Sequence, residues 1–158
     1  MFNRLQDVFK SFQRHKVRYV VIGGIASVLH GVPRATFDLD ILIEATPENT
    51  RRLLDALLSA GFGTADLTTV DDLLAHEITV FQDRVRLDVQ TATPGINFSQ
   101  AWKNRRVMSY QGQEFFILSR QDLLTSKRAA GREIDLEDAR LLELGKDEEP
   151  GQPSDSEH

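Results

Sequence analysis

The spacing of apolar residues along the chain predicts helices and strands in mixed order. Near the N-terminus, apolar residues recur at helical spacing and predict an amphipathic helix over residues 2–15, with these inward positions: Leu5, Val8, Phe9 and Phe12. Further helices are expected over residues 25–30, 46–61, 98–103, 119–130 and 134–144. Strands are expected over residues 19–22, 37–43, 77–81, 85–91, 107–110 and 114–117, whereas residues 64–74 have no clear period.

This order of elements predicts an α/β or α+β domain in which a mixed β-sheet is flanked by helices. A length of 158 residues suits one domain, which we place at residues 1–145. Residues 146–158 contain five acidic residues against one lysine and are predicted to be an acidic disordered tail. Most of the net charge of −5 lies in that tail, so a nearly neutral domain neither requires nor excludes a nucleic-acid partner.

Several site classes and locations are excluded or disfavoured by what the sequence lacks. The chain contains no cysteine, which excludes disulfides and thiolate metal sites. No apolar run approaches the length needed to span a bilayer, and the first residues lack the apolar centre of a secretory signal. We therefore expect a cytoplasmic protein without a membrane partner.

Two carboxylates share one face of the strand predicted at residues 37–43. Because alternate residues of a strand point to the same face, Asp38 and Asp40 project together, opposite Leu39 and Ile41. Neighbouring carboxylates repel one another and resist desolvation unless a cation lies between them. Magnesium typically binds one or two protein carboxylates together with substrate phosphates. Such acid pairs are also common on solvent-facing sheets, so their neighbours decide the interpretation.

A third carboxylate lies in a second alternating strand. Between residues 84 and 90, apolar and polar residues alternate, so Asp88 projects from the polar face and could lie beside Asp40. Alone, Asp88 would be a surface residue of a hairpin. Together with the first pair, it predicts a site for two metal ions that activate a hydroxyl and stabilise a leaving pyrophosphate.

The residues before the first acid pair suit phosphate binding. Gly23 and Gly24 lie between a strand and a short helix, where backbone N–H groups attract phosphate, although any such turn can use glycine. Arg34 could bind a phosphate by a forked contact. Thr36 could donate to a phosphate or, equally, satisfy a backbone group. Glycines, arginine and acids within one turn-helix-strand unit predict a nucleotide site.

The C-terminal charged residues have simpler interpretations. Lys127, Arg128 and Arg132 are expected to form a solvated basic face, with Lys127 alternatively reaching a triphosphate. On the last helix, we expect Asp135 and Asp138 to be exposed or, alternatively, to line the cleft. We expect three leucines of that helix to pack inward: Leu136, Leu141 and Leu144.

The stretch GGIASVLHGVPRATFDLDILIE, from Gly23 to Glu44, resembles the signature of the nucleotidyltransferase superfamily typified by DNA polymerase beta. That signature combines a glycine pair or Gly-Ser, a short helix, Asp-x-Asp on a strand and a later strand aspartate. Within the superfamily, the chain is most similar to small bacterial proteins of the AbiEii and MenT toxin type. These share the longer pattern of Gly-Gly, His-Gly, Arg-x-Thr and Asp-x-Asp.

The resemblance implies the polymerase-beta-like fold and transfer of a nucleoside monophosphate from an NTP, such as ATP, to a hydroxyl acceptor with two Mg²⁺ ions. Matching positions imply that Gly23 and Gly24 hold the triphosphate, that Asp38 and Asp40 bind the metals, and that Asp88 binds the acceptor-side metal. Residues 126–135 resemble the family's C-terminal Lys…Arg…Asp element, which implies a phosphate contact for Lys127.

The resemblance further implies an RNA, protein or small-molecule acceptor and an antitoxin partner in a toxin–antitoxin pair. Two alternatives stay open at this point. One is a catalytically inactive module of the same fold that binds a nucleotide or a partner protein. The other is a structural or assembly protein without affinity for nucleotides.

Overall fold

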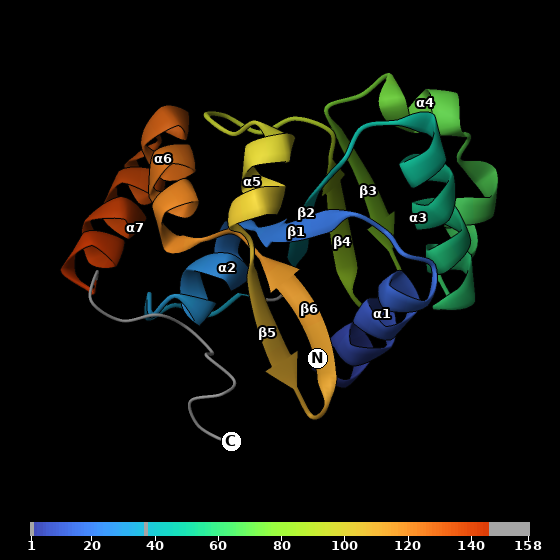
Figure 1. Cartoon of the computed structure of the whole chain (residues 1–158), viewed down its shortest axis with the longest axis horizontal. Coiled ribbons are helices and arrows are strands. Elements are labelled where there is room, and N and C mark those ends of the chain that lie inside the picture. The colour runs from blue at the N-terminus through green and yellow to red at the C-terminus, as the bar shows by residue number, and fades with distance from the viewer. Residues whose placement is uncertain (1, 37, 146–158) are drawn as a thin grey trace.

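A computed structural model describes residues 2–36 and 38–145 as a six-stranded mixed sheet flanked by helices, which confirms the predicted fold class (Figure 1). The strands are β1 (Tyr19–Ile22), β2 (Leu39–Ile43), β3 (Ile78–Gln82), β4 (Arg86–Gln90), β5 (Arg106–Tyr110) and β6 (Gln113–Ile117). The helices are α1 (Phe2–Arg14), α2 (Gly23–Leu29), α3 (Pro47–Ser59), the 3₁₀ helix η1 (Gly63–Leu67), α4 (Val70–Leu74), α5 (Phe98–Asn104), α6 (Arg120–Ala130) and α7 (Glu133–Leu144). The predicted tail at 146–158 lies outside the described residues.

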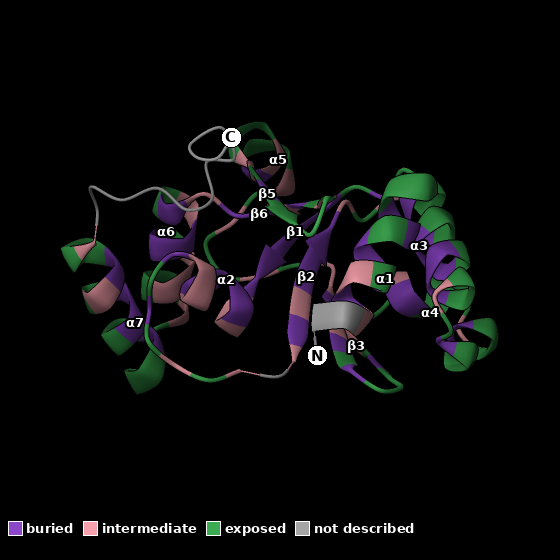
Figure 2. Cartoon of the chain, turned by 90° about the horizontal axis from the view of Figure 1, so that it is seen from below, coloured by how far each residue is buried: buried purple, intermediate pink, exposed green. Residues whose placement is uncertain are grey.

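The sheet has the strand order β3-β4-β2-β1-β6-β5. Strands β2 and β4 are parallel, as are β1 and β6, whereas β1 is antiparallel to β2. Hairpins form both ends, with β3 antiparallel to β4 and β5 antiparallel to β6. The central strand β1 is buried along its whole length, as Figure 2 shows, because helices cover it. This order places β4 beside β2, although β3 lies between these two strands in the sequence.

Aromatic packing fixes α1 against the sheet, as its helical pattern predicted. The Phe9 ring stacks on Phe115 of β6 with 4.4 Å between ring centroids. The Phe12 ring lies 4.8 Å from the ring of Tyr19 on β1. The Tyr19 hydroxyl accepts a hydrogen bond of 3.3 Å from the backbone N–H of Phe116, and burial raises the pKa of this phenol. These contacts pack α1 on strands β1 and β6 of the sheet.

Helix boundaries follow the residues that cap them. The Thr46 side chain accepts a hydrogen bond from the N–H of Asn49, and the Ser119 side chain accepts one from the N–H of Asp122, so the first residues of these two predicted helices are their N-caps. Gly131 ends α6 with a φ of 70°, a left-handed conformation that favours glycine. Residues 64–74, for which no element was predicted, form η1 and α4.

The last helix packs on a different face from the one predicted. Leu136 and Leu144 are 50% and 74% exposed, so their predicted inward packing is wrong, while Leu141 is partly buried against the core. The buried stripe of α7 instead contains these residues, spaced three, one and three apart: Asp135, Asp138, Ala139 and Leu142. Counting leucines selected the wrong stripe, because two acidic residues of the buried stripe find cationic partners in the folded chain.

Within residues 2–36 and 38–145, no helix is both long and apolar enough to cross a membrane.

Candidate functional site

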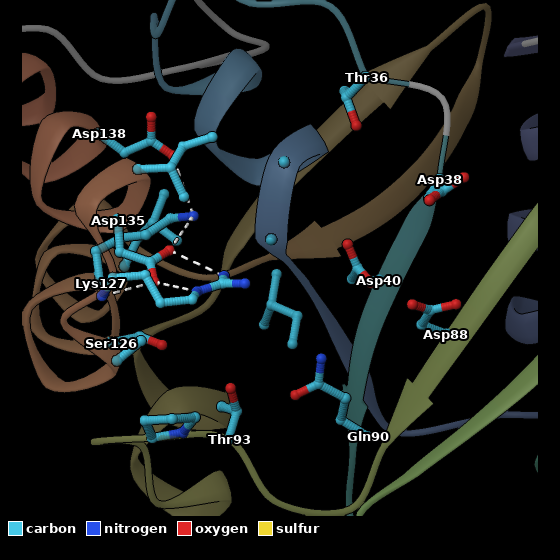
Figure 3. A pocket seen from close by; sticks show the side chains of 18 of the residues that line it. Thr36, Asp38, Asp40, Asp88, Gln90, Thr93, Ser126, Lys127, Asp135 and Asp138 are labelled. Carbon is cyan, nitrogen blue, oxygen red and sulfur yellow. Dashed lines mark hydrogen bonds and ion pairs between the residues drawn. The ribbon is translucent and has the colours of Figure 1, made fainter.

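A cavity of about 700 Å³ lies between the acidic strands and the C-terminal helices. Figure 3 shows Asp38, Asp40 and Asp88 on one side of it and Lys127 with its acidic neighbours on the other, with α2 between them. Every residue predicted for the site lines this cavity: Gly23, Gly24, Arg34, Thr36, Asp38, Asp40, Asp88 and Lys127. The chain therefore brings these residues together, while their roles stay predictions.

The carboxylates of Asp40 and Asp88 are neighbours because β2 and β4 are parallel and place these two residues in register. Burial raises the pKa of Asp40 to about 7, and the charge and hydrogen bonding of Asp88 and the charge of Asp38 add to this effect. The positive charge of Arg86 opposes it. The buried Asp40 carboxyl thus lies against a second acidic side chain, an arrangement that a bound cation would stabilise.

The raised pKa of Asp40 gives the metal-free protein an unusual pH dependence. The pKa is about 7 in the folded chain against an ordinary value of 3.8, so the folded state binds more protons between these values. We expect the free energy of unfolding to fall as the pH rises from about 4 to about 7 and then to level off. Urea denaturation in EDTA measures this slope. Asp40→Asn should flatten it, and a wild-type curve that rises over the same range would contradict the assignment.

Two adjacent carboxylates of the site are suitable ligands for a hard divalent cation. Asp40 and Asp88 offer the one or two carboxylates that magnesium usually takes from a protein. Among the residues that the structure describes, however, no three acidic or histidine side chains form a ready-made metal-binding group. Asp88 is also engaged, because its Oδ1 accepts a hydrogen bond of 2.9 Å from Nε of Arg86. Asp40 and Asp88 are thus adjacent, but Asp88 already forms an ion pair with Arg86.

The glycine pair allows α2 to approach the acidic strand closely. Gly23 has a φ of 70°, and a Cβ at this position would lie 2.4 Å from Oδ2 of Asp40. A Cβ on Gly24 would lie 2.7 Å from Oγ1 of Thr36. The two glycines were predicted in a turn but are the first residues of α2. Close packing is therefore sufficient to require both glycines, and phosphate binding is a further role that we propose below.

Gly23→Ala should impair the site more than it destabilises the fold. We expect a loss of about 1 kcal/mol from the left-handed backbone, and transfer activity reduced on the order of 10- to 100-fold because the carboxylate of Asp40 must move. Gly112→Ala is the matched control, since Gly112 has a φ of 83° and no atom within 4 Å of an added Cβ. Equal activity in the two variants would show that Gly23 does not position Asp40.

The opposite wall is a buried ionic network. Nζ of Lys127 lies 3.1 Å from Oδ2 of Asp138 and 3.5 Å from Oδ1 of Asp135. Arg34 donates to Asp138, and Nε of Arg132 donates to Asp135 over 2.6 Å. The side chains of Asp135 and Asp138 are only 2% exposed, so their predicted exposure is wrong. The predicted solvated position of Lys127 is also wrong, because its side chain is 11% exposed and lines the cavity.

The charges of this network leave an excess of one positive charge. Burial alone would raise the pKa of Asp135, but the hydrogen bond and charge of Arg132 and the charge of Lys127 outweigh it and lower that pKa. The stabilisation from Asp135 is therefore lost only as the pH falls below about 4. This range lies below the range of about pH 4 to 7 in which Asp40 changes the stability. Three cations surround two anions, so the wall can still attract a phosphate.

The spacing of Asp135 and Asp138 carried a usable signal. The two acids lie at helical spacing from the apolar residues Ala139 and Leu142, so all four belong to one continuous stripe of the helix. The pairing of Arg34 with Asp138 carried no such signal, because 104 residues separate them. Gln90 and Thr93, which also line the cavity, were not predicted either.

Residues 1–146 match the model of a protein family described as nucleotidyltransferase of unknown function, DUF6036. No curated protein matches the chain significantly.

Proposed function

This chain belongs to the nucleotidyltransferase family DUF6036, and on that premise we propose that it transfers a nucleoside monophosphate from an NTP to a hydroxyl acceptor in a Mg²⁺-dependent reaction. One observation carries the proposal: the in-register carboxylates of Asp40 and Asp88 face a cavity whose other wall is cationic. Such a cavity suits a substrate that is anionic at one end and brings divalent cations with it.

Asp38, Asp40 and Asp88 are the residues that would hold the metal. Bound Mg²⁺ would lower the pKa of the acceptor hydroxyl and neutralise charge on the pyrophosphate. The acceptor oxygen forms a bond to the α-phosphorus, while the bond from that phosphorus to the pyrophosphate oxygen breaks. The hydroxyl proton passes to the carboxylate of Asp88, which then releases it to solvent. Pyrophosphate leaves with the electron pair of the broken bond.

The cationic wall is where we place the triphosphate. Lys127 and Arg34 are held by Asp138, so their positive charges are fixed in position before a substrate binds. The backbone of Gly23 and Gly24 and the hydroxyl of Thr36 line the same cavity and would bind the remaining phosphate oxygens. The triphosphate would thus span the cavity from Lys127 to Asp40.

The biological setting follows from the resemblance of residues 23–44 to the AbiEii and MenT toxin type. We propose a cytoplasmic enzyme of a toxin–antitoxin pair that uses ATP or another NTP and modifies RNA or a protein. The support is the motif from Gly23 to Asp40, whose glycine pair and acids meet in one cavity.

A second candidate function is a module that binds an NTP without transferring it. The ion pair between Arg86 and Asp88 favours this candidate, because it supplies a protein cation where an active enzyme would need a metal. Turnover distinguishes the two candidates, since only the enzyme releases pyrophosphate.

The proposal is tested by incubating the chain with α-labelled NTPs and total RNA, in Mg²⁺ and in EDTA. We expect label to be transferred and pyrophosphate to be released only in Mg²⁺. If neither product forms with any NTP, the transferase proposal fails and the binding module remains.

A further inference from the structure

Two exposed apolar residues lie beside the third carboxylate. Ile78 and Val80 of the edge strand β3 are 52% and 47% exposed, although they belong to a strand of the sheet. In the antiparallel pair of β3 and β4, Val80 is the partner of Asp88 and Ile78 is the partner of Gln90. Partners across two strands project to the same face, about 5 Å apart at Cβ. An apolar strip therefore adjoins Asp88 on the face that carries the acids.

The strip is continuous with the cavity. Ile78 lines the cavity together with Asp88 and Gln90, so the apolar surface begins inside it and extends outward along β3. On the other face of the same strand, Phe81 is only 1% exposed. The folding core thus accounts for one face of β3, while nothing in the core requires isoleucine and valine on the other face.

The direction of the proposed reaction places the acceptor on this side. In phosphoryl transfer, the attacking oxygen and the leaving group lie roughly in line on opposite sides of the phosphorus. If the triphosphate extends toward Lys127, the attacking hydroxyl approaches from the side of Asp88 and β3. The group that carries this hydroxyl then rests on Ile78 and Val80.

Two arginines beside the strip favour a nucleic acid over a protein. Arg86 and Arg84 are exposed in the same β3–β4 hairpin, and the guanidinium of Arg86 lies on the face of Asp88. The acidic residue of the hairpin turn, Asp83, is paired with Arg4 over 2.6 Å. Apolar side chains next to arginines suit the flat base and the phosphate of a nucleotide.

We propose that Ile78 and Val80 form the acceptor subsite, which binds the terminal base of a single-stranded nucleic acid whose 3′-hydroxyl attacks the NTP. Arg86 contacts the adjacent phosphate. The inference rests on the proposed transferase function and adds the acceptor class and the residues that select it. RNA and DNA share this chemistry, and the acceptor assay separates them.

The experiment measures binding as well as turnover. Short 5′-labelled RNA and DNA strands, each ending in an intact nucleotide or in an abasic one, are titrated with the full chain in Mg²⁺ without NTP. The variant Ile78→Thr/Val80→Thr keeps β-branched side chains on the strand but removes apolar surface. Val107→Thr is the matched control, because Val107 is 37% exposed on β5, the edge strand at the other end of the sheet.

We expect wild type and Val107→Thr to bind the intact end about tenfold more tightly than the abasic end. The double variant should lose this preference, and its KM for the strand should rise about tenfold with little change in kcat. The RNA and DNA arms identify which strand is the better acceptor.

Three outcomes would overturn the inference. They are an unchanged base preference in the double variant, label transferred to protein instead of a strand, and a change confined to the oligomeric state of the double variant. Each of them is compatible with Mg²⁺-dependent release of pyrophosphate by wild type, so the transferase proposal can stand when the acceptor proposal fails.

Discussion

Asp40→Asn should melt at a higher temperature than wild type in EDTA at about pH 8, while its transfer activity falls on the order of 10³-fold. The stability gain follows because the folded chain holds the Asp40 carboxylate with a pKa raised to about 7, by burial first and then by Asp88 and Asp38. A neutral amide removes both the desolvation cost and the repulsion. Activity is lost because the amide is a poor metal ligand and no longer completes the carboxylate pair.

The comparison needs a control for net charge and a second condition. Asp66→Asn makes the same change at an exposed position of η1 and should alter neither property. In saturating Mg²⁺ with an NTP analogue, wild type should gain thermal stability and Asp40→Asn should gain little. A lower melting temperature for Asp40→Asn than for wild type in EDTA would show that the carboxylates do not oppose folding.

Lys127→Met should destabilise the protein by about 3 kcal/mol and abolish measurable NTP binding. The Lys127 side chain is 11% exposed and is paired with the buried Asp135 and Asp138, so its removal leaves buried negative charge with less compensation. The same ammonium is the cation that we assign to the triphosphate. Urea denaturation and calorimetry measure the two effects separately.

Two further variants separate stability from binding. Arg128→Met removes a neighbouring cation of α6 whose ion pair with Glu143 is about half exposed, and it should change the free energy of unfolding by less than about 1 kcal/mol. Lys127→Met/Asp138→Asn removes one charge of each sign and should recover part of the lost stability, but not NTP binding. Recovery of NTP binding in the double variant would show that Lys127 does not bind the triphosphate.

Strand alternation predicted the residue types of the acidic wall but only part of their arrangement. Asp40 and Asp88 share a face because they are in register on the parallel strands β2 and β4, whereas Asp38 immediately precedes β2 and reaches the same cavity from there. Their meeting also required β4, and not β3, to lie next to β2, which alternation does not decide.

The ionic wall could not be predicted in the same way. Hydrophobic patterning places charged residues outside, and this rule fails where partners from distant segments supply the opposite charge. Arg34 reaches Asp138 across 104 positions of sequence, and this contact joins α7 to a segment that no local pattern links to it. The pairing of Arg86 with Asp88 depends equally on side-chain conformation in the folded strand.

The central claim is that the carboxylates and the cationic wall together bind a metal–triphosphate complex. Calorimetric titration tests it directly: the wild-type chain is titrated with non-hydrolysable analogues of the NTPs, in Mg²⁺ and in EDTA. We expect at least one analogue to bind in Mg²⁺, with affinity lower by about tenfold or more in EDTA and in Asp40→Asn. Equal affinity in Mg²⁺ and EDTA, or no binding of any analogue, would contradict it.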